Sequence, residues 1–213
     1  MSNWRTNISL FSLCLITVPA IAKDLPQNFD PSKYSQTVTE CDRLAAHSED
    51  PNKVAAGVAE AKVDLPAAIA ACRIDLAKDA GNPRLQYQLG RALSYAGQID
   101  EALPLLESSS RLAYPQAQFV LGYLLLDGRL KAPVDRCGAL EWFRQSARQQ
   151  RMAAQIGLAA WYLDGHFAKC PNRPTRAELL GNLAAARAQN PKFYPELLIS
   201  DLERQLGARQ RVK

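Results

Sequence analysis

The sequence predicts an all-α protein, an α/α superhelical solenoid of stacked antiparallel helix hairpins. Helix-forming residues such as Ala, Leu, Arg and Gln are abundant after residue 22, and no stretch shows the alternation of β-branched residues that is typical of a strand. Gly and Pro divide the chain into segments as long as single globular helices. One motif also recurs in tandem, and such a repeat is typical of solenoids.

Residues 1–22 have the composition of a cleavable signal peptide. Arg5 precedes the apolar run 8–18, which is too short to span a hydrocarbon layer roughly 30 Å thick, so an uncleaved anchor is disfavoured. Ala20 and Ala22 supply the small residues expected before a cleavage site. The mature protein is therefore expected to start at residue 23, in the periplasm or secreted, with no stable membrane insertion.

Lipidation of Cys14 is the alternative at this end, and the bulky Leu13 before it argues against that modification. The net charge of the whole chain is +5, with basic residues scattered among acidic ones except near the C-terminus. This distribution is not that of a nucleic-acid-binding surface. The C-terminal cations suit a solvated helix end, and attraction to anionic lipid or cell-wall polymer stays open; they are Arg204, Arg209, Arg211 and Lys213.

An N-terminal helical hairpin is expected over residues 23–80. Apolar residues at helical spacing predict a first helix over 32–46, and a second helix is expected over 65–78 after a loop at 48–63. If the two helices are antiparallel, Cys41 and Cys72 come to lie opposite each other. A disulfide there contributes on the order of 3 kcal/mol by restricting the unfolded chain.

The segment 81–190 repeats itself, which is the strongest signal in the chain. Leu89-Gly90 recurs as Leu121-Gly122, and the pattern from Ala117 to Gly128 recurs 37 residues later, from Ala154 to Gly165. A glycine after the leucine of a first helix lets the second helix of its hairpin approach closely. Stacked hairpins cover one another's apolar faces, and residues 191–213 are expected to form a C-terminal capping helix, over 192–209, and a basic tail.

The motif carried by Ala117–Gly128, Val134-Asp135 and Ala139–Phe143 resembles the Sel-1-like repeat, a relative of the tetratricopeptide repeat. The preceding segment, 82–115, resembles a tetratricopeptide repeat, with Leu89, Gly90, Ala102 and Leu106 at the expected offsets. The resemblance covers about residues 82–190. It implies a repeat scaffold of the kind found in exported bacterial proteins.

The four cysteines of the mature chain predict two disulfides in an oxidising compartment. Matching the repeats by offset places Cys137 at the start of one second helix and Cys170 in the inter-helix loop of the neighbouring unit, so that this pair ties adjacent units together. Cysteine-rich secreted members of the family use disulfides similarly. A metal site is disfavoured because His47 and His166 do not lie at ligand spacing with the cysteines.

In the tetratricopeptide family, the first helix of each unit lines a concave face where peptides dock. Carried over by position, that face is a candidate binding surface rich in aromatic and arginine side chains, which concentrate binding energy. Packing in the core is the competing interpretation, above all for Phe119. The candidate residues are Arg84, Tyr87, Arg91 and Tyr95 from the first unit, and Gln116, Phe119 and Tyr123 from the second.

No catalytic motif is present, and no cofactor or metal is expected. A second aromatic set is assigned to the core: Trp142, Phe143, Trp161 and Tyr162. The sequence therefore favours a periplasmic scaffold that binds a protein or peptide partner in the cell envelope, as an adaptor or regulator of envelope signalling, and not an enzyme. The alternatives are a β-lactam-hydrolysing enzyme, which the family resemblance alone suggests, and a purely structural envelope spacer.

Overall fold

A computed structural model describes residues 27–129 and 132–208 of the chain. The predicted signal peptide, Cys14 and the basic residues Arg209, Arg211 and Lys213 lie outside these residues. The described part is all helical and has no strand, as the sequence predicted. No helix in these ranges combines the length and apolar character needed to cross a membrane.

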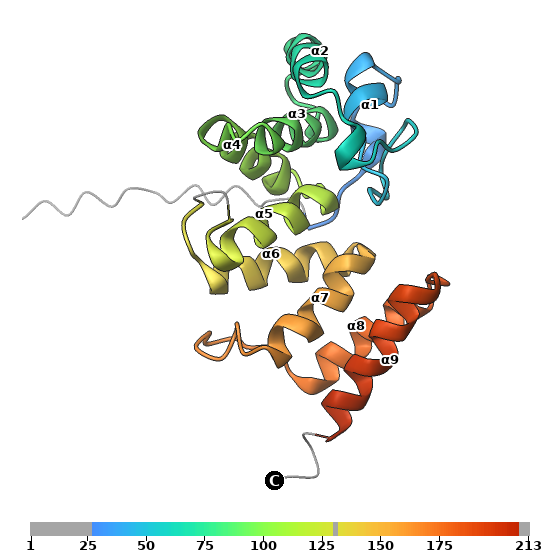
Figure 1. Ribbon diagram of the computed structural model, residues 1–213, viewed down its shortest axis with the longest axis vertical. Helices are drawn as coiled ribbons and strands as arrows, with labels where there is room; N and C mark the ends of the chain where they lie inside the picture. Colours follow the sequence, from blue (N-terminus) through green and yellow to red (C-terminus); the bar gives the residue numbers. More distant parts are fainter. Residues whose placement is uncertain (1–26, 130–131, 209–213) are drawn as a thin grey trace, which may run out of the picture.

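The α-helices follow one another along the long axis of the molecule, from α1 and α2 at one end to α9 at the other (Figure 1). Two short 3-10 helices, Pro31–Lys33 and Glu60–Lys62, lie in the N-terminal segment. The α-helices of the described residues are α1 (Glu40–Ala45), α2 (Leu65–Lys78), α3 (Pro83–Tyr95), α4 (Ile99–Arg111), α5 (Pro115–Asp127), α6 (Arg136–Arg148), α7 (Met152–Leu163), α8 (Arg176–Arg187) and α9 (Phe193–Ala208).

Helix starts follow the chemistry of the sequence. Pro83 and Pro115 occupy first-turn positions, where the missing amide proton has no helical partner to lose. Asp64, Asp135 and Thr175 each accept a backbone N–H of the first turn through the side chain. The positions of the Pro residues and of the capping side chains therefore determine where these helices begin.

Within the repeats, α3 pairs with α4, α5 with α6 and α7 with α8. The predicted close approach at the two glycines is confirmed. A Cβ atom at Gly122 would lie 2.8 Å from the Phe143 ring, and one at Gly90 would lie 3.0 Å from Leu106. A side chain at either position would push the paired helices apart.

Polar side chains repeat with the hairpins. The amides of Gln118 and Gln155 each donate to a carbonyl eight residues earlier, at Ser110 and Ala147. Gln86, which occupies the equivalent position of the first unit, donates to the Ala80 carbonyl. These buried glutamines link the first helix of each unit to the end of the preceding helix or to the turn after it. The Ser110 and Ala147 carbonyls also accept the backbone N–H groups of Ala113 and Gln150.

The first helix is shorter than predicted. The sequence indicated a helix over 32–46, but α1 begins at Glu40, and Thr39 forms a capping box with Asp42. The stretch before it is extended because its carbonyls bond to side chains of the first repeat: Ser35 accepts from Arg84 at 2.8 Å and from Asn82 at 3.2 Å. Long-range hydrogen bonds replace the local helical ones.

Both predicted disulfides are present, Cys41–Cys72 between α1 and α2 and Cys137–Cys170 between adjacent units. Their Cα atoms are 4.4 Å and 5.4 Å apart. The first bridge is fully buried in the N-terminal apolar cluster, where α1, α2 and α3 meet. It fastens the N-terminal segment to the helical array.

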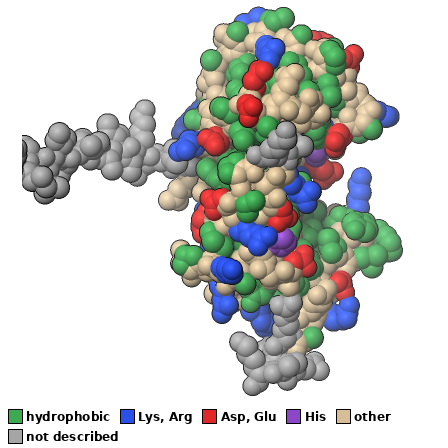
Figure 2. Space-filling model, turned by 60° about the vertical axis from the view of Figure 1, so that its left-hand side comes forward, with side chains coloured by type: hydrophobic (Ala, Val, Ile, Leu, Met, Phe, Trp, Pro, Cys, Tyr) green, Lys and Arg blue, Asp and Glu red, His purple; other side chains and the backbone are tan. Residues whose placement is uncertain are grey.

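The C-terminal helix α9 packs on α7 and α8 through Ile199, Leu202 and Leu206, which are buried. Phe193 and Leu197, at the start of the same helix, are 80% and 52% exposed. Elsewhere on the surface, Figure 2 shows Lys and Arg side chains interspersed with Asp and Glu over the face in view. Neither positive nor negative charge predominates on that face.

Candidate partner-binding groove

One groove gathers six of the seven residues that the sequence placed on the binding face. Its cavity volume is about 640 Å³. Residues three or four positions apart on a helix share a face, so α3 and α5 each present one row of side chains to the groove. The rows are Tyr87, Arg91 and Tyr95 from α3, and Gln116, Phe119 and Tyr123 from α5.

Each row runs from the floor of the groove to its rim. Tyr87, Arg91 and Gln116 form the floor and are at most 4% exposed. Phe119 and Tyr95 are half-buried, and Tyr123 is 37% exposed at the rim. A partner therefore meets the aromatic rim first and reaches the polar floor only by entering the groove.

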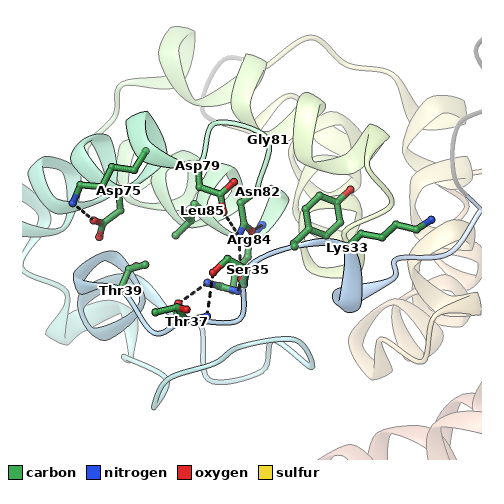
Figure 3. Close-up of a pocket in the computed structure, with 12 residues that line it drawn as sticks. Lys33, Ser35, Thr37, Thr39, Asp75, Asp79, Gly81, Asn82, Arg84 and Leu85 are labelled. Carbon is green, nitrogen blue, oxygen red and sulfur yellow. Dashed lines mark hydrogen bonds and ion pairs between the residues drawn. The ribbon is translucent and has the colours of Figure 1, made fainter.

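The seventh residue, Arg84, does not face the groove, and the structure removes it from the expected set. Its side chain is 2% exposed and forms a buried ion pair with Asp42, with Nε 2.8 Å from Oδ1. Figure 3 shows Arg84 pointing between Ser35 and Thr37, whose carbonyls accept from its Nη1 and Nη2 atoms at 2.8 Å and 3.3 Å. Arg84 holds the N-terminal segment instead of a partner.

Arg91 lines the groove and also contacts the N-terminal segment. Its Nη1 atom donates to the carbonyls of Ala45 and Ala46, and its Nη2 atom donates to that of Val58, at distances between 2.8 and 3.2 Å. Its Nε atom donates to the Tyr95 hydroxyl at 3.1 Å. Arg91 therefore lines the groove while most of its donors fasten the N-terminal segment.

Seven groove residues were not identified from the sequence. Four carry ionisable side chains, His47, Glu60, Arg129 and Arg151, and the other three are Ser94, Val120 and Leu124. His47 and Glu60 come from the irregular N-terminal segment, whose path no periodicity predicts. Arg151 caps the start of α7, where most helices carry Ser, Thr, Asp or Asn. That unusual residue at a helix start was the available signal.

The groove has a cationic floor. Burial, together with the nearby charges of Arg91, Arg151 and Lys53, lowers the pKa of the His47 imidazole to about 4. Behind the floor, Asp50 is fully buried and accepts from the Tyr114 hydroxyl at 2.7 Å. Burial raises the pKa of the Asp50 carboxyl.

An aromatic wall closes the groove on the side of α7. The ring of Phe119 lies 6.4 Å from that of Tyr123 and 6.3 Å from that of Trp161, and Trp161 stacks on the buried Phe143 at 4.0 Å. Phe119 thus packs between units and faces the groove at once. Two guanidinium groups lie over this wall, Arg129 at 4.2 Å from Tyr123 and Arg151 at 5.1 Å from Phe119.

Within residues 27–129 and 132–208, no three His, Cys, Asp or Glu side chains are grouped as metal ligands. The predicted loop residue His166 lies beside Asp127, with Nδ1 3.4 Å from Oδ1. The groove thus offers aromatic surface, hydrogen-bond donors and positive charge.

No family model matches the sequence. The fold is similar to the crystal structure of a Sel1 repeat protein from Oxalobacter formigenes, with a TM-score of 0.51 and 23% sequence identity. The match covers 61% of this chain and 97% of that one. Together with the paired helices and their inter-helix glycines, this similarity shows that the chain has the fold of a Sel1 repeat protein, a helical repeat scaffold.

Proposed function

We propose that this protein is an exported scaffold that binds a protein or peptide partner in the cell envelope, as an adaptor or regulator of envelope signalling. One observation carries the proposal: the groove between α3 and α5 joins side chains from two repeats and from the start of a third. No single hairpin offers this surface, so the stacking of the hairpins creates it.

The groove suits a peptide segment in size and chemistry. A cavity of about 640 Å³ lies within the usual range for ligand sites and accommodates a few side chains. Tyr95, Phe119 and Tyr123 supply rigid aromatic surface, of the kind that contributes much of the binding energy at interfaces. The floor adds donors that fix the orientation of the bound segment.

Two disulfides and the composition of residues 1–22 support the proposed location. Structural disulfides persist in oxidising compartments such as the periplasm and are rare in the cytosol. The signal peptide lies outside the described residues and remains part of the proposal. N-terminal sequencing of the protein recovered from an envelope fraction should begin at residue 23.

Affinity capture tests the function. The full chain is expressed in its host with a C-terminal tag, and partners are captured from the envelope fraction. The groove variant combines Tyr123→Ala with Arg129→Ala, because both side chains are exposed at the rim and their loss leaves the buried floor intact. We expect it to lose the wild-type partner, with binding of the purified partner weakened by about tenfold or more.

The matched control combines Phe193→Ala with Tyr194→Ala, which removes similar exposed aromatic surface from α9. It should retain the partner. Identical partners in the wild type and the groove variant contradict the role of the groove. No discrete partner for the wild type supports a structural spacer instead.

A further inference from the structure

Arg151 is a buried cation whose donors are largely unused. Arg151 is 5% exposed, and its Nε atom donates to the Gln116 side chain. Its two Nη atoms make no hydrogen bond to any described residue, and no described carboxylate lies within 4.0 Å of it. Since Arg151 lines the groove, these free N–H groups are open to a ligand.

The other two buried arginines of the described residues, Arg84 and Arg91, are satisfied by the chain itself. Arg84 pairs with Asp42, and Arg91 donates to three backbone carbonyls and to Tyr95. Burial lowers the pKa of the Arg151 guanidinium, and the nearby Glu49 and Asp50 act in the opposite direction, but neither carboxylate forms an ion pair with it. Arg151 therefore differs from its neighbours in lacking acceptors, not in being buried.

A second polar atom in the groove also lacks a partner. The Tyr87 hydroxyl is fully buried and makes no hydrogen bond of normal geometry, although Gln116 lies near enough to influence its pKa. Tyr87 and Arg151 both flank Gln116 on the groove floor. Unpaired donors thus converge on one part of the floor.

The position of Arg151 is unfavourable for the stability of the free protein. Burial strips hydration from the Arg151 guanidinium, and no ion pair with a described residue within 4.0 Å restores it, although the Phe119 ring lies 5.1 Å away and Glu49 and Asp50 are nearby. Arg151 also stands at the start of α7, where the helix dipole favours anions over cations. An anionic group entering the groove would compensate both effects.

We propose that the Arg151 guanidinium binds a carboxylate of the peptide partner. The planar pair of Nη groups matches a carboxylate, and Phe119 and Tyr123 cover an apolar side chain beside it. The ligand is therefore an acidic peptide segment with an adjacent apolar residue. This inference rests on the proposed function.

Peptide display tests the ligand class. The wild-type protein is used to select from two libraries of random short peptides, one with free C-termini and one with the random segment internal. Enrichment of Asp or Glu next to apolar residues in both libraries identifies a side-chain carboxylate. Selection only from the free C-terminal library identifies a terminal carboxylate.

The other outcomes separate the two proposals. Selection of apolar peptides whose binding does not depend on a carboxylate overturns the inference and leaves the peptide-binding function intact. Failure to enrich any peptide contradicts both. Binding that the Tyr123→Ala, Arg129→Ala variant retains places the peptide outside the groove, which also overturns the inference.

Calorimetric titration then assigns the contact to Arg151. The enriched peptide is compared with its neutral counterpart, in which Glu is replaced by Gln or the C-terminus is amidated. Wild type should bind the neutral peptide about ten- to a hundredfold more weakly. Arg151→Gln, which keeps an amide next to Gln116, should bind the two peptides equally.

The control is Arg148→Gln, since Arg148 is exposed and lines a different hollow on the outer side of α6. It should discriminate between the peptides as wild type does. Thermal melting supplies a second readout: Arg151→Gln should have a Tm equal to or above that of wild type. A lowered Tm with unchanged peptide discrimination would show that Arg151 is structural.

Discussion

Three arginines of this protein show that the role of a side chain depends on the acceptors around it. Arg84 and Arg91 lie on α3, which is buried from Pro83 to Ser94, and their donors reach carbonyls of the N-terminal segment. Arg151 is buried to a similar degree but has one side-chain acceptor, on Gln116. Breaking the Arg84–Asp42 pair would leave a buried charge without its partner. Arg151 has no such ion-pair partner among the described residues.

At the same scale, His47 should make stability depend on pH. The pKa of its imidazole is about 4 in the folded protein, against an ordinary value of 6.5, so the unfolded chain binds the proton first as pH falls. The contribution of neutral His47 is therefore full above pH 6.5 and is lost as pH falls towards 4. After allowance for partial exposure, we expect a loss of about 1–2 kcal/mol.

Chemical denaturation at pH 7 and pH 4.5 measures this effect. The His47→Asn variant keeps an acceptor for the Glu49 N–H, which His47 Nδ1 accepts at 3.0 Å. It should lose less stability than wild type over this interval. Equal losses would show that groups other than His47 govern the acid response. The buried Asp50 is not one of them, because its raised pKa makes stability rise as pH falls.

The groove was predictable at this scale only in part. Helical spacing brought six residues together because α3 and α5 are regular. Arg84 was misplaced because spacing along α3 does not reveal which face the N-terminal segment covers. His47, Glu60 and Arg151 were missed because they lie in loops or at a helix start, where no periodicity applies.

At the scale of the elements, local chemistry fixes the hairpins well and irregular segments poorly. The helix over 65–78 was predicted to the residue, because Asp64 and Pro66 mark its start and the Gly81-Asn82-Pro83 turn follows it. The helix over 32–46 was overpredicted, because Arg84 and Asn82 hold Ser35 in extended backbone from nearly fifty residues away. Sequence patterns report local preferences and not such distant partners.

The contact between α5 and α6 gives a prediction at this scale. Gly122→Ala would place a methyl group 2.8 Å from Phe143 and 3.1 Å from the Ala139 carbonyl. Overpacking of this kind costs about 1–3 kcal/mol, which should exceed the gain of about 1 kcal/mol from the higher helix propensity of Ala. We expect a lower free energy of unfolding in urea.

Gly181→Ala is the matched control. Gly181 lies within α8, and a Cβ atom there meets nothing within 4 Å. This variant should be as stable as wild type or more so, by up to about 1 kcal/mol. Equal stabilisation by both substitutions would show that α5 and α6 tolerate a wider separation than the structure indicates.

At the scale of the whole molecule, two apolar clusters divide the array. One joins α1 to α5 and the other joins α5 to α9, so α5 belongs to both. The Cys41–Cys72 disulfide lies in the first cluster and Cys137–Cys170 in the second. Each half of the array therefore has one covalent link between segments about thirty residues apart.

Replacing Cys41 and Cys72 together by Ala should lower the free energy of unfolding by about 3 kcal/mol, since the bridge closes a loop of 31 residues. The loss should concentrate on α1 and the segment before it, measured by faster amide hydrogen exchange there. The Cys137→Ala, Cys170→Ala pair serves for comparison, because its loop is similar in length. Unchanged exchange in α1 would show that Arg84 and Arg91 hold the segment unaided.

The hydrogen bonds from Arg84 to the backbone of Ser35 and Thr37 have a practical consequence for protein engineering. The guanidinium donates to the carbonyls of Ser35 and Thr37, and the Thr37 side chain is exposed, whereas the Gln36 amide donates to the carbonyls of Pro31 and Tyr34. Because Arg84 contacts backbone oxygens, a fluorophore attachment point can replace Thr37 without loss of these hydrogen bonds.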